Sequence, residues 1–334
     1  MSLIYLFIGF FFNCFLLKKF IFIADKYQIV AVPDSRSSHK GTVVSGAGFI
    51  FIFVFIFLFY SQSFRLNFVL PFVSVLSIFF TSFLDDIIDI KFYYKLFYQV
   101  LFLFLLFFSL GCDFIFCIPL LLIFFVNINV SNFMDGVNGM TFLYFLVSFV
   151  SFIFIDFKIN VILLDNVYFF YIILLSCLLS FGFFNFRKKA ICFLGDVGSI
   201  SLGLIFSGCV VYYFLLLKEQ TLINYPYLII LFFFIYYLDV FYTLLNRFSS
   251  NQNIFKPHKK HLYQILANNY FKSHITSSFL YSFFQLIMNI IVLVILFSKN
   301  FFLSKLMLVV LCFYICLIIF IYFYVQKNIV KENS

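Results

Sequence analysis

Two neighbouring acids, Asp85 and Asp86, follow an apolar run over residues 68–84 that is long enough to cross a bilayer. Charge beside hydrocarbon is costly, and the C-terminal end of a helix also disfavours anions. A cation must therefore offset the cost. Mg²⁺ with a phosphate-bearing substrate is one solution, because proteins usually hold Mg²⁺ with one or two carboxylates plus substrate phosphates. The alternative is that both acids are ordinary loop residues beside Lys91 and Lys95.

A basic stretch over residues 32–48 precedes that run. Arg36 and His39 can donate hydrogen bonds to phosphate oxygens, and Gly46 and Gly48 allow a backbone to approach closely. We interpret the stretch as a phosphate-contacting loop. The alternative is a basic loop that only sets membrane orientation.

A third polar segment, residues 131–140, stands directly before another apolar run. Asp135 and Asn138 alternate there with Gly136 and Gly139, which permit a tight turn. A carboxylate and an amide at fixed spacing can accept from and donate to a base or a ribose. The segment is a candidate nucleotide site, and a plain turn is the alternative.

Another acid, Asp196, is flanked by Gly195 and by Gly198-Ser199 at the start of an apolar run. Asp196 can ligate a metal, and the N–H groups at the start of the following helix suit a phosphate. A helix N-cap is a simpler role for this acid, but it does not explain the glycines on both sides.

Two histidines, His258 and His261, lie three positions apart in the longest polar stretch, residues 246–275. Because neither Cys nor a third His stands at ligand spacing, a zinc site is not expected. Contact with a phosphate is the favoured interpretation, with a solvated basic loop as the alternative.

These segments interrupt a chain that is otherwise strongly apolar. Of its 334 residues, 65% are hydrophobic and 10% are charged, whereas soluble proteins carry about a quarter charged residues. The composition predicts an all-α polytopic membrane protein. The formal charge of +9 is spread over short loops, which argues against nucleic-acid binding, and the eight Cys have neither zinc-site nor disulfide-framework spacing.

Spans of about 17 to 25 residues predict eleven transmembrane helices in a single domain, residues 1–334. Their expected bounds are 3–23, 46–60, 68–84, 94–110, 114–130, 140–156, 166–184, 200–217, 226–245, 276–298 and 302–325. The first run has no signal-peptide features and should remain as a span. An odd number of spans places the two termini on opposite sides of the membrane.

The distribution of basic residues predicts the orientation of the chain in the membrane. Seventeen of the twenty-two Lys and Arg fall on the same side of the predicted spans, so the positive-inside rule puts the N-terminus outside and the C-terminus in the cytoplasm. All the candidate residues then face the cytoplasm. We expect one active site built from loops 24–48, 85–95, 131–140, 185–203 and 246–275.

Together these segments resemble the polyprenyl-phosphate N-acetylhexosamine-1-phosphate transferases, enzymes of the glycosyltransferase family 4 type that start bacterial surface glycans. The resemblance rests on five motifs in the family's order: Pro33 with Arg36-Ser37-Ser38-His39, Leu84-Asp85-Asp86, Asn132 with Asp135-Gly136 and Asn138-Gly139, Phe193-Leu194-Gly195-Asp196 with Gly198-Ser199, and His258 with His261-Leu262-Tyr263-Gln264.

Two features refine this resemblance. The stretch from Asp239 to Arg247, followed by the histidines, is most like the branch that initiates O-antigen. The chain departs from its relatives at Thr42-Val43-Val44-Ser45, where they usually carry Pro-Thr-Pro-Arg, and at Ala47, which replaces a glycine.

The resemblance implies transfer of a sugar-1-phosphate from a UDP-N-acetylhexosamine to undecaprenyl phosphate, with release of UMP. It implies Mg²⁺, or Mn²⁺ in its place, as cofactor, a bacterial inner (plasma) membrane location, and a homodimer as a further expectation. It assigns Asp85 and Asp86 as catalytic groups, Asp196 and Asp86 as metal ligands, Asp135, Asn138, Asn132 and Asn185 to the nucleotide, and His258, His261, Arg36, His39 and Ser199 to phosphate or sugar.

The alternative function is a transporter or channel, in which membrane-level acids such as Asp85 and Asp239 carry ions or protons. Two features of the sequence favour the enzyme. The sequence shows no inverted repeat, and its polar residues gather at span ends on one side.

Overall fold

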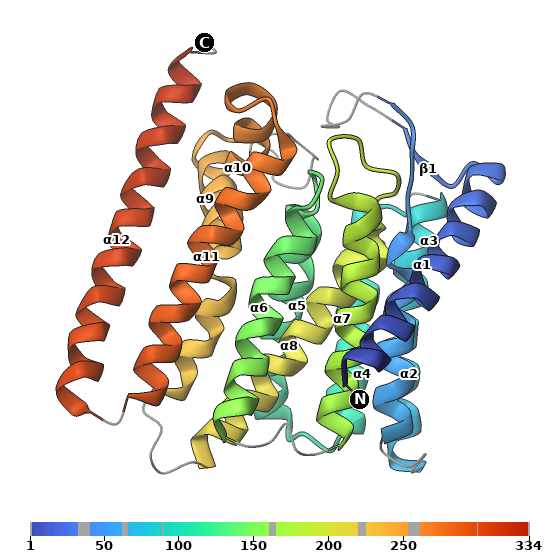
Figure 1. Ribbon diagram of the computed structural model, residues 1–334, viewed down its shortest axis with the longest axis horizontal. Helices are drawn as coiled ribbons and strands as arrows, with labels where there is room; N and C mark the ends of the chain where they lie inside the picture. Colours follow the sequence, from blue (N-terminus) through green and yellow to red (C-terminus); the bar gives the residue numbers. More distant parts are fainter. Residues whose placement is uncertain are drawn as a thin grey trace.

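The computed structural model describes residues 2–32, 41–61, 66–88, 90–159, 165–219, 225–252, 261–298 and 300–332. Within these ranges the chain forms a bundle of antiparallel helices (Figure 1). Its longer helices are α1 (Ser2–Lys26), α2 (Ile52–Ser61), α3 (Val69–Ile88), α4 (Phe92–Ser109), α5 (Phe114–Met134), α6 (Met140–Ile159), α7 (Asp165–Asn185), α8 (Gly195–Glu219), α9 (Phe234–Ser249), α11 (His274–Phe297) and α12 (Phe301–Glu332).

Shorter elements connect or extend these helices. They are the 3₁₀ segments η1 (Ala47–Phe51), η2 (Leu66–Phe68) and η4 (Pro226–Phe233), helix α10 (Leu262–Ile265), the π-helical turn η5 (Leu266–Tyr270), and the two-residue strands β1 (Val30–Ala31) and β2 (Val43–Val44), which pair antiparallel.

Ten helices in the described parts of the chain are long and apolar enough to cross a membrane, and an eleventh apolar segment, Ala47–Ser61, is shorter. The protein is therefore an all-α multi-pass membrane protein, which confirms the fold class predicted from composition. Several predicted bounds were too narrow: α3 continues to Ile88, α5 continues to Met134, and α8 begins at Gly195. Hydropathy marks the apolar middle of a helix, whereas backbone hydrogen bonds carry the helix on into polar residues.

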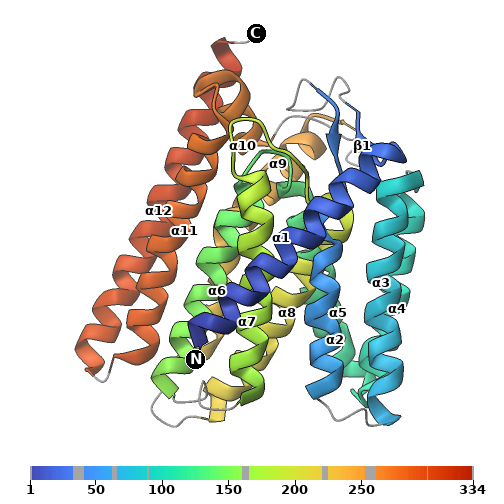
Figure 2. The ribbon, with the colours of Figure 1, turned by 45° about the vertical axis from the view of Figure 1, so that its right-hand side comes forward.

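Successive helices reverse direction, so the segments that follow α1, α3, α5, α7 and α9 gather at one end of the bundle (Figures 1 and 2). Helix α12 ends at this same end, whereas α1 begins toward the opposite one (Figure 1). The motif-bearing segments are therefore neighbours in space although they are far apart in sequence.

Helix α8 is the central element, and its first half is buried among α3, α5 and η1. Gly and Ser in this half allow close helix approach. The tightest contact is between Gly48 of η1 and Gly198 of α8, where a Cβ on Gly48 would lie 2.1 Å from the Gly198 Cα. The Gly48 N–H also donates to the Leu194 carbonyl at 2.8 Å. These two motif glycines therefore serve backbone packing that fixes the start of α8.

The predicted span 226–245 is broken between η4 and α9. Backbone groups freed at such a break need partners inside a membrane. Gln285 of α11 supplies them, since its Oε1 accepts from the Ile235 N–H at 3.1 Å and its Nε2 donates to the Leu231 carbonyl at 2.8 Å. The break is thereby held in place and sets the direction of α9, which carries Asp239.

Candidate active site

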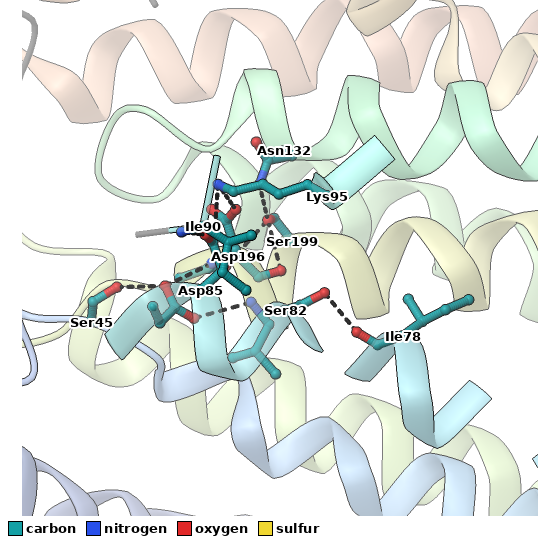
Figure 3. A network of polar contacts seen from close by, with 12 residues as sticks. Ser45, Ile78, Ser82, Asp85, Ile90, Lys95, Asn132, Asp196 and Ser199 are labelled. Carbon is teal, nitrogen blue, oxygen red and sulfur yellow. Dashed lines mark hydrogen bonds and ion pairs between the residues drawn. The ribbon is translucent and has the colours of Figure 1, made fainter. Parts of the chain in front are cut away.

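Lys95, in the first turn of α4, lies between two carboxylates from other helices (Figure 3). Its Nζ is 3.1 Å from Oδ2 of Asp196 and forms an ion pair with Asp85. The second oxygen of Asp85 accepts from the Ile90 N–H at 2.6 Å. The Asp85 side chain is nearly buried, whereas about a quarter of Lys95 and of Asp196 is exposed. The cluster therefore opens to its surroundings on the Lys95 and Asp196 side.

Asp86 faces the start of α8. Its Oδ1 accepts from the Asp196 N–H at 2.9 Å and its Oδ2 accepts from the Val197 N–H at 3.1 Å. The Ser45 hydroxyl donates to the same carboxylate at 3.1 Å. A carboxylate at a helix N-terminus accepts hydrogen bonds from N–H groups that have no partner within the helix, and its negative charge interacts favourably with the helix dipole. The N–H groups of the second and third residues of α8 are thus occupied by a side chain, a contact that the sequence-based phosphate site at this helix start did not anticipate.

Gly195 makes room for this cap. Its φ of +76° is left-handed, and a Cβ there would lie 2.4 Å from Oδ2 of Asp86. A side chain would therefore be strained by the backbone and would displace the carboxylate. This explains the glycine before Asp196, which an N-cap role for Asp196 left unexplained.

Ser199 and Asn132 connect the cluster to the end of α5. The Asn132 side-chain amide donates to the Ser199 hydroxyl at 3.2 Å, and that hydroxyl donates to the Gly195 carbonyl at 3.1 Å. Figure 3 shows both side chains beside Asp196. Ser199 is almost fully buried, so its contacts in the structure are to protein groups.

Asp135 lies just past the end of α5, and its Oδ1 accepts from the Thr141 hydroxyl at 2.5 Å. Removal from water raises the pKa of its carboxyl to about 7; the Thr141 hydrogen bond works in the opposite direction, and the charge of Asp196 adds to the rise. The carboxyl therefore changes charge near neutral pH, which makes Asp135 a functional-site candidate.

Asn138 and Asn185 join this loop to the segment after α7. The Asn138 amide donates to the Arg187 carbonyl at 2.9 Å, and Asn185 Oδ1 accepts from the Gly139 N–H at 2.7 Å. Both side chains are buried. Their visible contacts fix the loop, and contact with a nucleotide stays a prediction for each.

His261 lies against the same loop, since its ring stacks on Phe133 with centroids 6.2 Å apart. Its Nδ1 is 2.9 Å from Oδ1 of Asp239. Three other predicted site residues, Arg36, His39 and His258, lie outside the described residues.

The donor set suits a cation. Among the described residues, three carboxylates, those of Asp85, Asp86 and Asp196, meet one ammonium, that of Lys95, so these four groups carry an excess of negative charge when the acids are ionised. Within the described ranges, no group of three or more His, Cys, Asp or Glu side chains is arranged to hold a metal ion by itself. That arrangement fits Mg²⁺ held by one or two carboxylates and completed by substrate phosphates.

Sequence reasoning missed the role of Lys95, which it treated only as a neighbour of the acids. It also missed Ser45 and Thr141 as hydrogen-bond partners of site carboxylates. A basic residue in the first turn after an acidic helix end was the available signal for Lys95.

The fold and site define a multi-pass membrane protein with an acidic cluster at one end of its bundle. Residues 68–214 match the family model described as glycosyl transferase family 4, so this part of the chain is similar to that family. The matched residues include Asp85, Asp86, Asp135 and Asp196. No curated protein matches the chain significantly. This match supports, at a coarse level, transfer of a phospho-sugar to a polyprenyl phosphate.

Proposed function

We propose that the protein transfers a sugar-1-phosphate from a UDP-N-acetylhexosamine to undecaprenyl phosphate and releases UMP. The product would start a lipid-linked surface glycan such as O-antigen or teichoic acid. We place the protein in a bacterial inner (plasma) membrane with the acidic cluster facing the cytoplasm, because most Lys and Arg lie on that side of the predicted spans.

One observation carries this proposal: residues of three motifs converge on one cluster. Asp85 and Asp196 share Lys95, Asp86 caps the helix that begins at Gly195, and Asn132 reaches Ser199 from the segment that holds Asp135. A solvated basic or acidic loop has no need of this convergence, whereas a diphosphate transfer needs opposite charges placed around one centre.

In the proposed reaction, an oxygen of the lipid phosphate attacks the sugar-linked phosphorus, and the bond from that phosphorus to UMP breaks. The nucleophile is already an anion, so the protein mainly positions two phosphates and balances charge. Bound Mg²⁺, or Mn²⁺, would supply a Lewis acid at the diphosphate. Asp196 would be its firmest ligand. Asp85 is favoured over Asp86 as the second metal ligand, because the Asp86 oxygens already accept hydrogen bonds from three donors.

The lipid tail has a suitable place beside the cluster. An apolar groove of about 630 Å³ runs between α4, α5 and α9, and its lining includes Leu96, Phe133 and Phe241. Leu96 follows Lys95 directly, and Phe133 precedes the loop with Asp135. A polyprenyl chain in this groove would bring its phosphate to the carboxylates.

The nucleotide would lie on the loop between α5 and α6. Asp135 would accept hydrogen bonds from the uridine, and Asn138 with Asn185 would keep the loop in shape. His261, which stacks on Phe133, would contact the diphosphate or sugar.

The test uses purified protein in nanodiscs with undecaprenyl phosphate, a panel of UDP-N-acetylhexosamines and Mg²⁺. We expect UMP release that requires both lipid and metal, with the lipid product identified by mass spectrometry. The matched control is Asp196→Asn. UMP release without lipid would refute the transfer, and ion flux through liposomes without any UMP release would favour the transporter.

A further inference from the structure

A fully buried carboxylate outside the acidic cluster, Asp239 of α9, binds groups from two other segments of the chain. Its Oδ1 lies 2.9 Å from His261 Nδ1 and 3.3 Å from the Leu262 nitrogen. Its Oδ2 lies 3.0 Å from the Tyr263 nitrogen and 2.5 Å from the Tyr281 hydroxyl. One side chain thus joins α9 to the start of α10 and to α11.

The contacts explain how a carboxylate is tolerated in this place. A buried anion is costly unless hydrogen-bond donors compensate it. Asp239 receives the first two N–H groups of α10, which would otherwise lack intrahelical partners. The carboxylate accepts from both N–H groups, and these N–H groups offset part of the cost of burying the carboxylate.

Asp239 also fixes the ring of His261. An ionised carboxylate can only accept, so Nδ1 carries the proton in this pair and Nε2 points away from Asp239. The ring packs against Phe133 at an interplanar angle of 28°. The Asp239 carboxylate therefore sets the tautomer of His261, and the carboxylate and the Phe133 ring together set the orientation of the imidazole.

Tyr263 extends the connection to the proposed nucleotide loop. Its N–H donates to Asp239, and its hydroxyl donates to the Phe133 carbonyl at 2.9 Å. Phe133 stands two positions before Asp135. The segment over residues 261–263 is thus held between Asp239 and the end of α5.

We propose that Asp239 is a positioning residue that holds His261 and the start of α10 against the end of α5, so that His261 faces the sugar-nucleotide donor. The part of this inference that concerns the donor rests on the proposed function. The part that concerns the Asp239 contacts does not, and the two are tested separately.

The first test is deuterium uptake by the backbone of residues 262–265 in nanodiscs, without substrate. Asp239→Ala removes the acceptor of two N–H groups, so uptake by this segment should rise. Asp239→Asn, which keeps the side-chain shape, should give an intermediate rise, because one amide oxygen replaces two carboxylate oxygens. The matched control is Asp156→Asn, which changes a buried acid near the end of α6 and should leave uptake here unchanged.

The second test is kinetic. For histidines that ligate a metal, loss of the orienting partner typically costs about 10- to 100-fold in activity, and we expect a loss of similar size in kcat/KM for the donor in Asp239→Asn. If Asp239 acts through His261, adding Asp239→Asn to His261→Ala should cause no further loss. A merely structural acid would instead give losses that multiply.

Unchanged uptake in folded Asp239→Ala would overturn the positioning contacts. If that variant does not insert, the same comparison in Asp239→Asn decides. Multiplicative losses in the double variant would overturn action through His261. Absence of UMP release from the wild-type protein would refute the proposed function instead, while the uptake result would still stand.

Discussion

Lys95 and Asp196 form an ion pair of 3.1 Å although 101 positions separate them in the chain. The pair joins the first turn of α4 to the first turn of α8. Since Lys95 also pairs with Asp85, one ammonium holds together acids from two helices. Part of the positive charge that we expected beside Asp85 and Asp86 is therefore supplied by a side chain of the protein, Lys95.

Replacing Lys95 by Met should remove this ammonium while keeping an apolar stem of similar length. Turnover should fall by about 100- to 1,000-fold, the size of effect found when one preorganised electrostatic contact is removed from an active site. Because Lys95 and a metal would share Asp85 and Asp196, the Mg²⁺ concentration needed for half-maximal turnover should also fall. Titrating UMP release with Mg²⁺ measures both effects.

The neighbouring Lys91 provides the control, because its side chain is exposed at the start of α4. Lys91→Met should leave the rate and the Mg²⁺ requirement unchanged. An equal loss in both variants would mean that general positive charge, and not the ion pair, supports the reaction.

Gly195→Ala should damage the site through the backbone. The substitution forces a side chain into a left-handed conformation and against the Asp86 carboxylate, so it removes the cap of α8. Loss of a helix cap costs about 0.5 to 2 kcal/mol of stability, and turnover should fall because Asp196 is the next residue. Thermal unfolding in detergent together with UMP release measures both.

The same helix offers a matched substitution at Gly208, where a Cβ would meet no atom within 4 Å. Gly208→Ala should be neutral or stabilise α8 by up to about 1 kcal/mol, since Ala is the better helix former. Similar destabilisation by both substitutions would show that the Asp86 contact is not the cause.

The fold could be predicted because a membrane demands continuous apolar helices, and each leaves a visible run in the sequence. The exact helix ends could not, as α8 shows: its first turn contains Gly195 and Asp196, which hydropathy assigns to a loop. The ends matter here because the site is built from them.

The side-chain partners of the candidate site residues could not be predicted from the sequence, for a related reason. Residue type identified Asp85 as a charge in need of compensation and Asp196 as a possible metal ligand, but no local pattern shows that Lys95 pairs with both. The sequence likewise predicted that Asn138 hydrogen-bonds to a nucleotide. In the structure its amide donates to the Arg187 carbonyl across the loop, a contact that the sequence does not reveal. Long-range partners of polar side chains are set by packing, which the sequence does not display.

Membrane orientation can be measured with introduced cysteines. In a variant without native Cys, Asn166→Cys at the start of α7 should react with a membrane-impermeant thiol reagent in intact cells, and Ser250→Cys after α9 should not. Both positions are exposed, so burial does not decide the result. Ser250→Cys should react once the cells are permeabilised, and the reverse pattern would place the acidic cluster outside.

The pKa of Asp135, raised to about 7 by burial, predicts a pH-dependent affinity for the donor. Below pH 7 the carboxyl is mostly protonated and neutral, and above pH 7 it is ionised and accepts hydrogen bonds only. If it accepts from the uridine, KM for the donor should rise as pH falls from 8 to 6. The pH step should disappear in Asp135→Asn, and a step that persists in this variant must come from another group.

Metal and nucleotide roles should separate between Asp196 and Asp135. Asp196→Asn removes a carboxylate that would hold the metal at the transferring phosphate, so kcat should fall by about 100- to 1,000-fold and added Mg²⁺ should not restore it. Asp135→Asn keeps the shape of the side chain but replaces one acceptor oxygen by a donor, so KM for the UDP-sugar should rise with a smaller change in kcat. Steady-state rates of UMP release, measured across donor and Mg²⁺ concentrations in protein shown to be folded and inserted, distinguish the two patterns. Equal losses of kcat with an unchanged donor KM in both variants would mean that the two acids act in one metal site, and the nucleotide would then have to be held by other residues.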